Sequence, residues 1–117
     1  MWIRGAAVEP FDFEGLQIRD YTAGLSSSSS LATIHVAPGI RHHRARSRRS
    51  DKYYYLLSGR IRFGLEAEEL DLAAGDFVLV PQGQTFWYEN RTSAPAVLLL
   101  VHTPAFDADA ELFVEPL

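Results

Sequence analysis

The feature that most constrains the fold is a regular spacing of turn residues between Gly39 and Asn90. In the first half of this stretch, Gly39 is followed by Ala45, Ser47, Lys52 and Gly59, with five, one, four and six residues between successive positions. In the second half, Gly75 is followed by Pro81, Gly83, Phe86 and Asn90, with five, one, two and three residues between them. Glycine and proline at such short intervals leave room for strands and turns but not for long helices.

Short segments with the period of a strand fill the rest of the chain. The predicted strands are 16–21, 31–36, 52–59, 60–65, 70–74, 77–80, 85–89 and 96–102. A helical pattern is present only weakly, over 107–113, and the serine run 26–30 is interpreted as a mobile loop or the start of a strand. Short strands separated by frequent turns predict an all-β sandwich or barrel.

The spacing resembles the two conserved motifs of the cupin superfamily, G-x5-H-x-H-x3,4-E-x6-G and G-x5-P-x-G-x2-H-x3-N. The resemblance implies a double-stranded β-helix, which is the jelly-roll or cupin barrel, over approximately residues 28–104. With 117 residues, the chain is expected to form a single cupin domain, 1–117, with an N-terminal arm over 1–15 and an acidic C-terminal tail over 105–117.

The positions that hold metal ligands in metal-binding cupins carry other residues here. They hold Ala45, Ser47, Lys52 and Phe86 in place of two histidines, a glutamate and a third histidine. Alanine and phenylalanine have no lone pair to offer, and an ammonium group replaces the carboxylate, so neither a metal nor another cofactor is expected. One alternative stays open, in which the non-motif histidines bind a metal: His35, His42, His43 and His102.

Strand parity places several chemically active side chains in the barrel. Side chains alternate along a strand, so the inward parity of Ala45 and Ser47 predicts that His43 faces the interior and His42 faces away. The candidate catalytic residues are therefore Lys52, His43 and Tyr54. The predicted ligand-binding pocket is completed by Ser47, Ala45, Phe86, Tyr88, Arg41 and His102.

Two classes of function fit this pocket. In the first, a metal-free barrel binds or transforms a small anionic or carbonyl-containing molecule, with Lys52 as the charge partner; isomerase, epimerase or cyclase chemistry is what the resemblance implies. In the second, the protein is a structural or ligand-sensing cupin without catalysis, and Lys52 pairs with Asp51 or Glu89. The sequence leaves open whether the protein is an enzyme and which ligand it binds.

The charges of the chain are segregated. The net charge is −4, but most basic residues lie between 41 and 62, whereas the acids lie near the two ends and in 66–76. This pattern predicts either a local anion site or arginines that pair with the acidic tail or with a second copy. No nucleic-acid partner is expected, because the basic stretch is short and no recognition motif accompanies it.

The remaining expectations concern the surroundings of the protein. The chain has no cysteine and no apolar run near the ~20 residues that span a membrane, so a cytoplasmic protein without a membrane partner is expected. Five large side chains are predicted on outer faces, namely Trp2, Ile3, Tyr53, Tyr55 and Trp87. Because that is more apolar surface than a small barrel leaves in water, a homodimer is expected.

Overall fold

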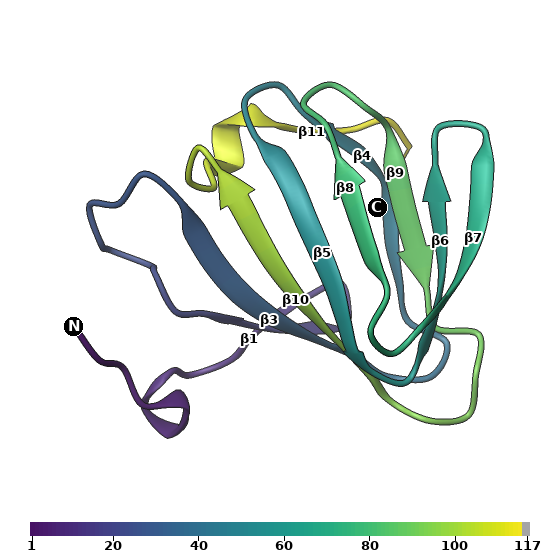
Figure 1. Cartoon of the computed structure of the whole chain (residues 1–117), viewed down its shortest axis with the longest axis horizontal. Helices are drawn as coiled ribbons and strands as arrows, with labels where there is room; N and C mark the ends of the chain where they lie inside the picture. Colours follow the sequence, from purple (N-terminus) through teal and green to yellow (C-terminus); the bar gives the residue numbers. More distant parts are fainter. Residues whose placement is uncertain (116–117) are drawn as a thin grey trace.

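The computed structural model describes residues 1–115 and shows two antiparallel sheets packed face to face (Figure 1). The strands are β1 (Phe11–Phe13), β2 (Leu16–Asp20), β3 (Ser30–Val36), β4 (Arg41–Ser47), β5 (Asp51–Ser58), β6 (Arg60–Leu65), β7 (Glu68–Ala73), β8 (Phe77–Val80), β9 (Phe86–Glu89), β10 (Ala96–Thr103) and β11 (Glu111–Phe113). Two single 3-10 turns, η1 (Gly5–Ala7) and η2 (Ala108–Ala110), are the helical elements of this part of the chain. The predicted double-stranded β-helix is confirmed.

Strand order places both ends of the chain beside the conserved barrel. One sheet has the order β1-β2-β3-β10-β5-β8 and the other has the order β11-β4-β9-β6-β7. The predicted N-terminal arm therefore contributes the edge strand β1, and the acidic tail contributes the edge strand β11. Among residues 1–115, no helix is long and apolar enough to cross a membrane.

The core lies between the two sheets and follows from the alternation of side chains. Along β10, every second residue from Ala96 to His102 is buried, because this strand pairs with β3 on one side and with β5 on the other. The largest fully buried side chains come from both sheets: Tyr54, Tyr88, Phe63, Phe86, Leu16, Leu56, Ile61 and Leu98. Two polar side chains that are buried with this core, Lys52 and His102, lie on the paired strands β5 and β10.

The predicted strands are present with ends that differ by at most two residues, and three strands of the structure are not among them, namely β1, β4 and β11. β1 and β11 are each three residues long, which is too short for an alternating pattern to stand out. The weak helix prediction over 107–113 is wrong, because these residues form only the turn η2 before the chain extends into β11. The serine run is a loop whose last residue, Ser30, begins β3.

Two arginines of β4 and one of the turn after it pair with the acidic tail, as one of the sequence hypotheses predicted. Arg41 lies 2.7 Å and Arg44 3.9 Å from the carboxylate of Glu115, and Arg49 lies 3.3 Å from Asp107. Exposed pairs of this kind contribute only ~0–1 kcal/mol each, so they orient the tail more than they stabilise the fold.

Gly64 on β6 is predicted to be intolerant of any side chain. An added Cβ would lie 1.8 Å from Nε1 of Trp87, which is buried on the neighbouring strand β9. We expect Gly64→Ala to lower the free energy of unfolding by ~1–3 kcal/mol, since overpacking forces strands apart. Urea denaturation checks this, with Gly5→Ala as the control, because a Cβ there meets only the Tyr21 hydroxyl at 3.2 Å. Equal stability of the two variants would contradict the packing described.

Candidate functional site

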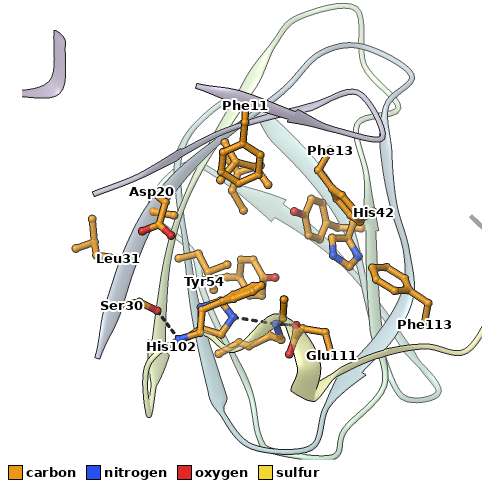
Figure 2. A pocket seen from close by; sticks show the side chains of 18 residues that line it. Phe11, Phe13, Asp20, Ser30, Leu31, His42, Tyr54, His102, Glu111 and Phe113 are labelled. Atoms are coloured by element: carbon orange, nitrogen blue, oxygen red, sulfur yellow. Dashed lines mark hydrogen bonds and ion pairs between the residues drawn. The ribbon is translucent and has the colours of Figure 1, made fainter. Parts of the chain in front are cut away.

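A cavity of about 290 Å³ opens between the two sheets (Figure 2). Its lining residues are Phe11, Phe13, Ile18, Asp20, Ser30, Leu31, Ala32, Ile34, His42, Lys52, Tyr54, Tyr88, Leu100, His102, Phe106, Ala108, Glu111 and Phe113. Figure 2 shows aromatic rings, including Phe13 and Phe113, around His42, and a separate polar group that includes His102 and Glu111. A mainly apolar cavity with a few convergent polar groups is the usual form of a small-molecule site.

Lys52 is the centre of the polar group. Its side chain is 4% exposed and its Nζ atom pairs with the carboxylate of Glu111 from β11. Nζ also lies 2.9 Å from Nε2 of His102 on β10. An ammonium group can only donate, so Nε2 of His102 accepts and the proton of that ring resides on Nδ1. Lys52 and His102 both line the cavity, and the acid beside Lys52 is Glu111, neither Asp51 nor Glu89.

Burial sets the charge states of this group. Burial lowers the pKa of the Lys52 ammonium, and the adjacent Glu111 carboxylate opposes that shift. Burial, together with the positive charge of Lys52, lowers the pKa of His102 to about 3. The ion pair of Lys52 and Glu111 therefore lies beside a neutral imidazole ring.

His42 on β4 is the second polar group of the cavity. Its Nδ1 lies 2.7 Å from the backbone oxygen of His43, and because a carbonyl can only accept, Nδ1 carries the hydrogen. The Nε2 atom is therefore an unprotonated acceptor. Burial lowers the pKa of His42 to about 3, and Lys52 acts in the same direction. The ring is stacked on Phe113 with the centroids 5.7 Å apart, which fixes its plane.

The predicted orientation of the two adjacent histidines is wrong. His42 lines the cavity and His43 does not. The reason is a bulge in β4, where the strand pairs with β9. His42 lies opposite Tyr88 and Ala45 lies opposite Phe86, so β4 advances three residues while β9 advances two. One extra residue reverses the parity, so His42 and Ala45 both face inward.

Two tyrosines and a phenylalanine form the aromatic wall beside His42. Tyr54 and Tyr88 line the cavity with their ring centroids 5.6 Å apart, and burial raises the pKa of both hydroxyls, so both are neutral donors. The Tyr88 hydroxyl is buried without a hydrogen-bond partner in residues 1–115. Phe86 lies behind this wall, with its ring centroid 4.9 Å from that of His42, so it supports the cavity and does not line it.

Three other predicted pocket residues lie elsewhere. Ala45 is part of the core, 1% exposed. Ser47 is buried too, but its Oγ accepts from the backbone of Ser50 at 2.9 Å and so closes the turn into β5. Arg41 reaches the tail carboxylate of Glu115. None of the three reaches the cavity.

The residues at the motif positions do not fit a divalent metal. Ala45 and Phe86 supply no lone pair, and Lys52 places a cation where the metal would lie, already paired with Glu111. Within residues 1–115, no group of three or more His, Asp or Glu side chains converges as metal ligands do. This geometry offers no support for the alternative of a site made from the four non-motif histidines.

Sequence reasoning missed most of the residues that close the cavity. Glu111 and Phe113 come from the tail, and Phe11 and Phe13 come from the N-terminal arm. The alternation of Phe11 with Phe13 across Asp12, and of Glu111 with Phe113 across Leu112, was a signal for two short strands. What the sequence could not indicate is which barrel edge each strand would join.

The two neutral histidines predict a loss of stability in acid. The unfolded chain takes up protons on these rings near pH 6.5, whereas folding lowers the pKa of His42 and of His102 to about 3. The unfolded state therefore binds more protons between these values, and the stability present above pH 6.5 is lost as the pH falls. Urea midpoints at pH 7 and pH 5 check this, and we expect a lower midpoint at pH 5 that is partly restored by His102→Gln. A midpoint that rises at pH 5 would contradict it.

Solved structures of known proteins share the fold. Pac13 from Streptomyces, described as a unique nucleoside dehydratase, is 23% identical with a TM-score of 0.85 over 98% of this chain and 91% of Pac13. Pac13 variants with one histidine or one tyrosine replaced have been solved with uridine. A predicted oxalate decarboxylase from Thermotoga maritima is 17% identical with a TM-score of 0.80, over 89% of this chain and 99% of that one. At these sequence identities, the structural similarity shows that the fold is shared and nothing more.

Sequence comparison gives a relative and a family. The tetracenomycin polyketide synthase protein TcmJ of Streptomyces glaucescens is 32% identical over 79 residues, which are 68% of this chain and 53% of TcmJ. The match thus spans about half the length of that relative. The profile of the cupin domain matches residues 32–102, more than half of the 117 residues. The chain therefore belongs to the cupin family.

Proposed function

We propose that the protein is an acid–base enzyme that acts without a metal and removes a proton from a carbon next to a carbonyl group in a small molecule. The observation that carries this proposal is the state of His42: a neutral, half-buried ring whose Nδ1 is bound to the backbone, so that its Nε2 is free to accept a proton. A general base must be unprotonated at the working pH and must face the substrate site. His42 meets both conditions.

The two tyrosines supply the complementary acid function. Removal of a proton next to a carbonyl places negative charge on the carbonyl oxygen, and fixed hydrogen-bond donors stabilise that charge best in a site that excludes water. Tyr54 and Tyr88 line the same cavity and keep their protons because burial raises the pKa of both. The buried Tyr88 hydroxyl has no partner in residues 1–115, so its hydrogen is not committed to another group of this part of the protein.

Elimination of water is the reaction that this set favours. When the enolate carries a hydroxyl on the next carbon, a carbon–carbon double bond forms as the carbon–oxygen bond breaks. The proton taken by His42 then returns to the departing hydroxide, which gives an unsaturated product and water and leaves the protein unchanged. The proposed substrate class is a nucleoside-like molecule with a carbonyl on its sugar, since Pac13, which shares the fold, is described as a nucleoside dehydratase. The carbonyl is needed because an ordinary sugar C–H is too weakly acidic.

A second candidate is ring closure or aromatisation of a small polyketide. The relative TcmJ is described as a polyketide synthase protein and is 32% identical over 79 residues. Polyketides are rich in carbonyl groups with acidic neighbouring C–H bonds, so the same base and the same hydroxyl donors would serve. The cavity of about 290 Å³ is near the lower end of the sizes usual for ligand pockets, so a compact molecule fits it better than an extended chain, which favours the first candidate.

The two candidates are separated by their products. The full chain, with a chelator present, is incubated with nucleosides oxidised to a sugar carbonyl and with short β-keto chains, and mass spectrometry records the loss of water. We expect the nucleoside carbonyl to lose one water at a rate that the chelator does not change. Activity that disappears with the chelator, or ligand binding with no turnover of either class, would overturn the proposal, and the second outcome would favour a ligand-sensing protein.

Pairing of two copies through the six-stranded sheet is part of the proposal. Outer faces of β5 and β8 present the exposed side chains Tyr55, Leu57, Phe77 and Leu79. Trp87, predicted to be exposed, is instead buried at 6% exposure between Arg44 and Arg91, so it does not contribute. Light scattering is expected to give the mass of a dimer, and Phe77→Lys should give a monomer. A monomeric wild type at micromolar concentration would contradict the pairing.

A further inference from the structure

The donors of Lys52 are only partly used. An ammonium group has three hydrogens, and in the described part of the chain Nζ directs one to Oε1 of Glu111 and one to Nε2 of His102. No third acceptor for Nζ is present there, although Phe86 places the face of its ring 5.2 Å away. Because Lys52 lines the cavity while its side chain is only 4% exposed, its remaining hydrogen is available to a bound molecule and hardly to bulk water.

The acceptors of Glu111 are partly used in the same way. The Oε1 atom accepts from Lys52, whereas the Oε2 atom receives no hydrogen bond from residues 1–115. Glu111 also lines the cavity, and its side chain is 15% exposed. The ion pair thus offers one unused hydrogen-bond donor, on Nζ of Lys52, and one unused acceptor, Oε2 of Glu111, on two side chains that contact each other and line the cavity.

From this geometry we propose that the Lys52–Glu111 pair is a binding subsite for an alcohol group of a neutral ligand. A hydroxyl is the small group that both donates and accepts through one atom, so it can accept from Nζ of Lys52 while donating to Oε2 of Glu111. The subsite deepens the proposed function, on which it rests, by assigning a neutral hydroxylated molecule as the substrate class. His42 and the two tyrosines act at the carbonyl, and the ion pair holds a hydroxyl.

The charges of the cavity oppose the anionic ligand that the sequence suggested. Its lining includes one ammonium, that of Lys52, and two carboxylates, those of Glu111 and Asp20. Both of its histidines are neutral, since burial lowers their pKa values to about 3. The charge of Lys52 is therefore already balanced by Glu111. A carboxylate or phosphate ligand would add a further negative charge beside Glu111 and Asp20, with no unpaired cation among these lining residues.

Three matched fragments test the subsite without any turnover: benzyl alcohol, benzoate and toluene. None has a C–H bond next to a ketone or an aldehyde, so the result does not depend on the proposed reaction. Titrations of the ¹⁵N-labelled full chain at pH 7, followed by NMR, give the three dissociation constants. We expect wild type to bind benzyl alcohol about tenfold more tightly than toluene, as hydrogen bonds to charged groups imply, and more tightly than benzoate.

Variants identify the groups responsible. Glu111→Gln should weaken the binding of benzyl alcohol relative to that of toluene. It should strengthen the binding of benzoate, because the benzoate carboxylate then takes the place of the Glu111 carboxylate beside Lys52. Glu115→Gln is the matched control, since it removes one tail carboxylate that lies outside the cavity lining, and it should keep the wild-type order. The double variant Lys52→Met with Glu111→Gln should lose most of the preference for the alcohol over toluene, because both charged groups are gone. This preference can be measured even if Glu111→Gln alone does not fold.

Two results would overturn the inference. One is a wild type that binds benzoate more tightly than benzyl alcohol, which would show that Lys52 is a free anion-binding cation. The other is a double variant that keeps the full preference for the alcohol over toluene. Failure of the proposed reaction would leave these fragment affinities as they are, so the two proposals fail separately.

Discussion

Replacing His42 by glutamine should lower the rate of water loss, and of proton exchange at the carbon next to the carbonyl, by about 10²–10⁴-fold, the usual contribution of a positioned general base. Glutamine keeps the length and the hydrogen-bonding capacity of the ring, but it has no basic nitrogen. The free Nε2 of His42 would be lost while Tyr54 and Tyr88 stay in the wall. Deuterium uptake from solvent, followed by NMR, separates the proton-transfer step from the later loss of water.

His43→Gln is the matched control for that experiment. It makes the same chemical change one residue further along β4, at a side chain that does not line the cavity. We expect this control to keep the wild-type rate within a few fold. Equal losses in the two variants, or a larger loss in His43→Gln, would mean that the bulge in β4 does not present His42 to the substrate and that the base has been assigned wrongly.

Breaking the Lys52–Glu111 pair from one side should have the largest effect on stability. Glu111→Gln leaves the ammonium of Lys52, 4% exposed, without its carboxylate partner, and removal of one partner of a buried pair costs ~3–5 kcal/mol. A lysine without a partner at this buried position could be replaced by methionine with the fold unchanged or more stable, because the substitution removes a buried charge. The presence of Glu111 changes that expectation, because methionine would strand a carboxylate that is 15% exposed.

Removal of both charges should restore most of the lost stability. The double variant Lys52→Met with Glu111→Gln has no unpaired charge, so we expect its stability to lie within ~1–2 kcal/mol of wild type, as replacements of whole buried pairs do. Urea unfolding of the four proteins gives the coupling energy between the two positions. Additive losses would show that the two side chains do not interact in the folded protein and would remove the basis of the alcohol subsite.

The barrel could be predicted from the sequence because its turn residues and its alternating strands are local signals. The spacing from Gly39 to Asn90 defines the motif positions, and the alternation along β6 and β10 defines which side chains are buried. Lys52, Tyr54, Tyr88 and His102 could be placed in the cavity for the same reason, since each lies on a regular strand whose inward parity follows from its neighbours.

The remaining part of the site depends on features that parity does not contain. One extra residue between His42 and Ala45 exchanges the inward and outward faces of β4, and no residue type in that stretch marks the bulge. Glu111 reaches Lys52 only because β11 pairs with β4 across a separation of more than sixty residues, with Glu111 opposite Ser47. The partner of a buried charge is thus decided by tertiary pairing, which a single sequence does not reveal.

The state of the His42 ring can be measured without a substrate. In ¹⁵N-labelled protein, two-bond proton–nitrogen correlations show which imidazole nitrogen carries hydrogen, and the signals that vanish in His42→Gln identify this ring. The structure predicts a neutral ring at pH 6, with the hydrogen on Nδ1 and a bare Nε2, because burial lowers the pKa of His42 to about 3. A ring protonated on both nitrogens at pH 6, or a neutral ring with its hydrogen on Nε2, would contradict the assignment of His42 as the base.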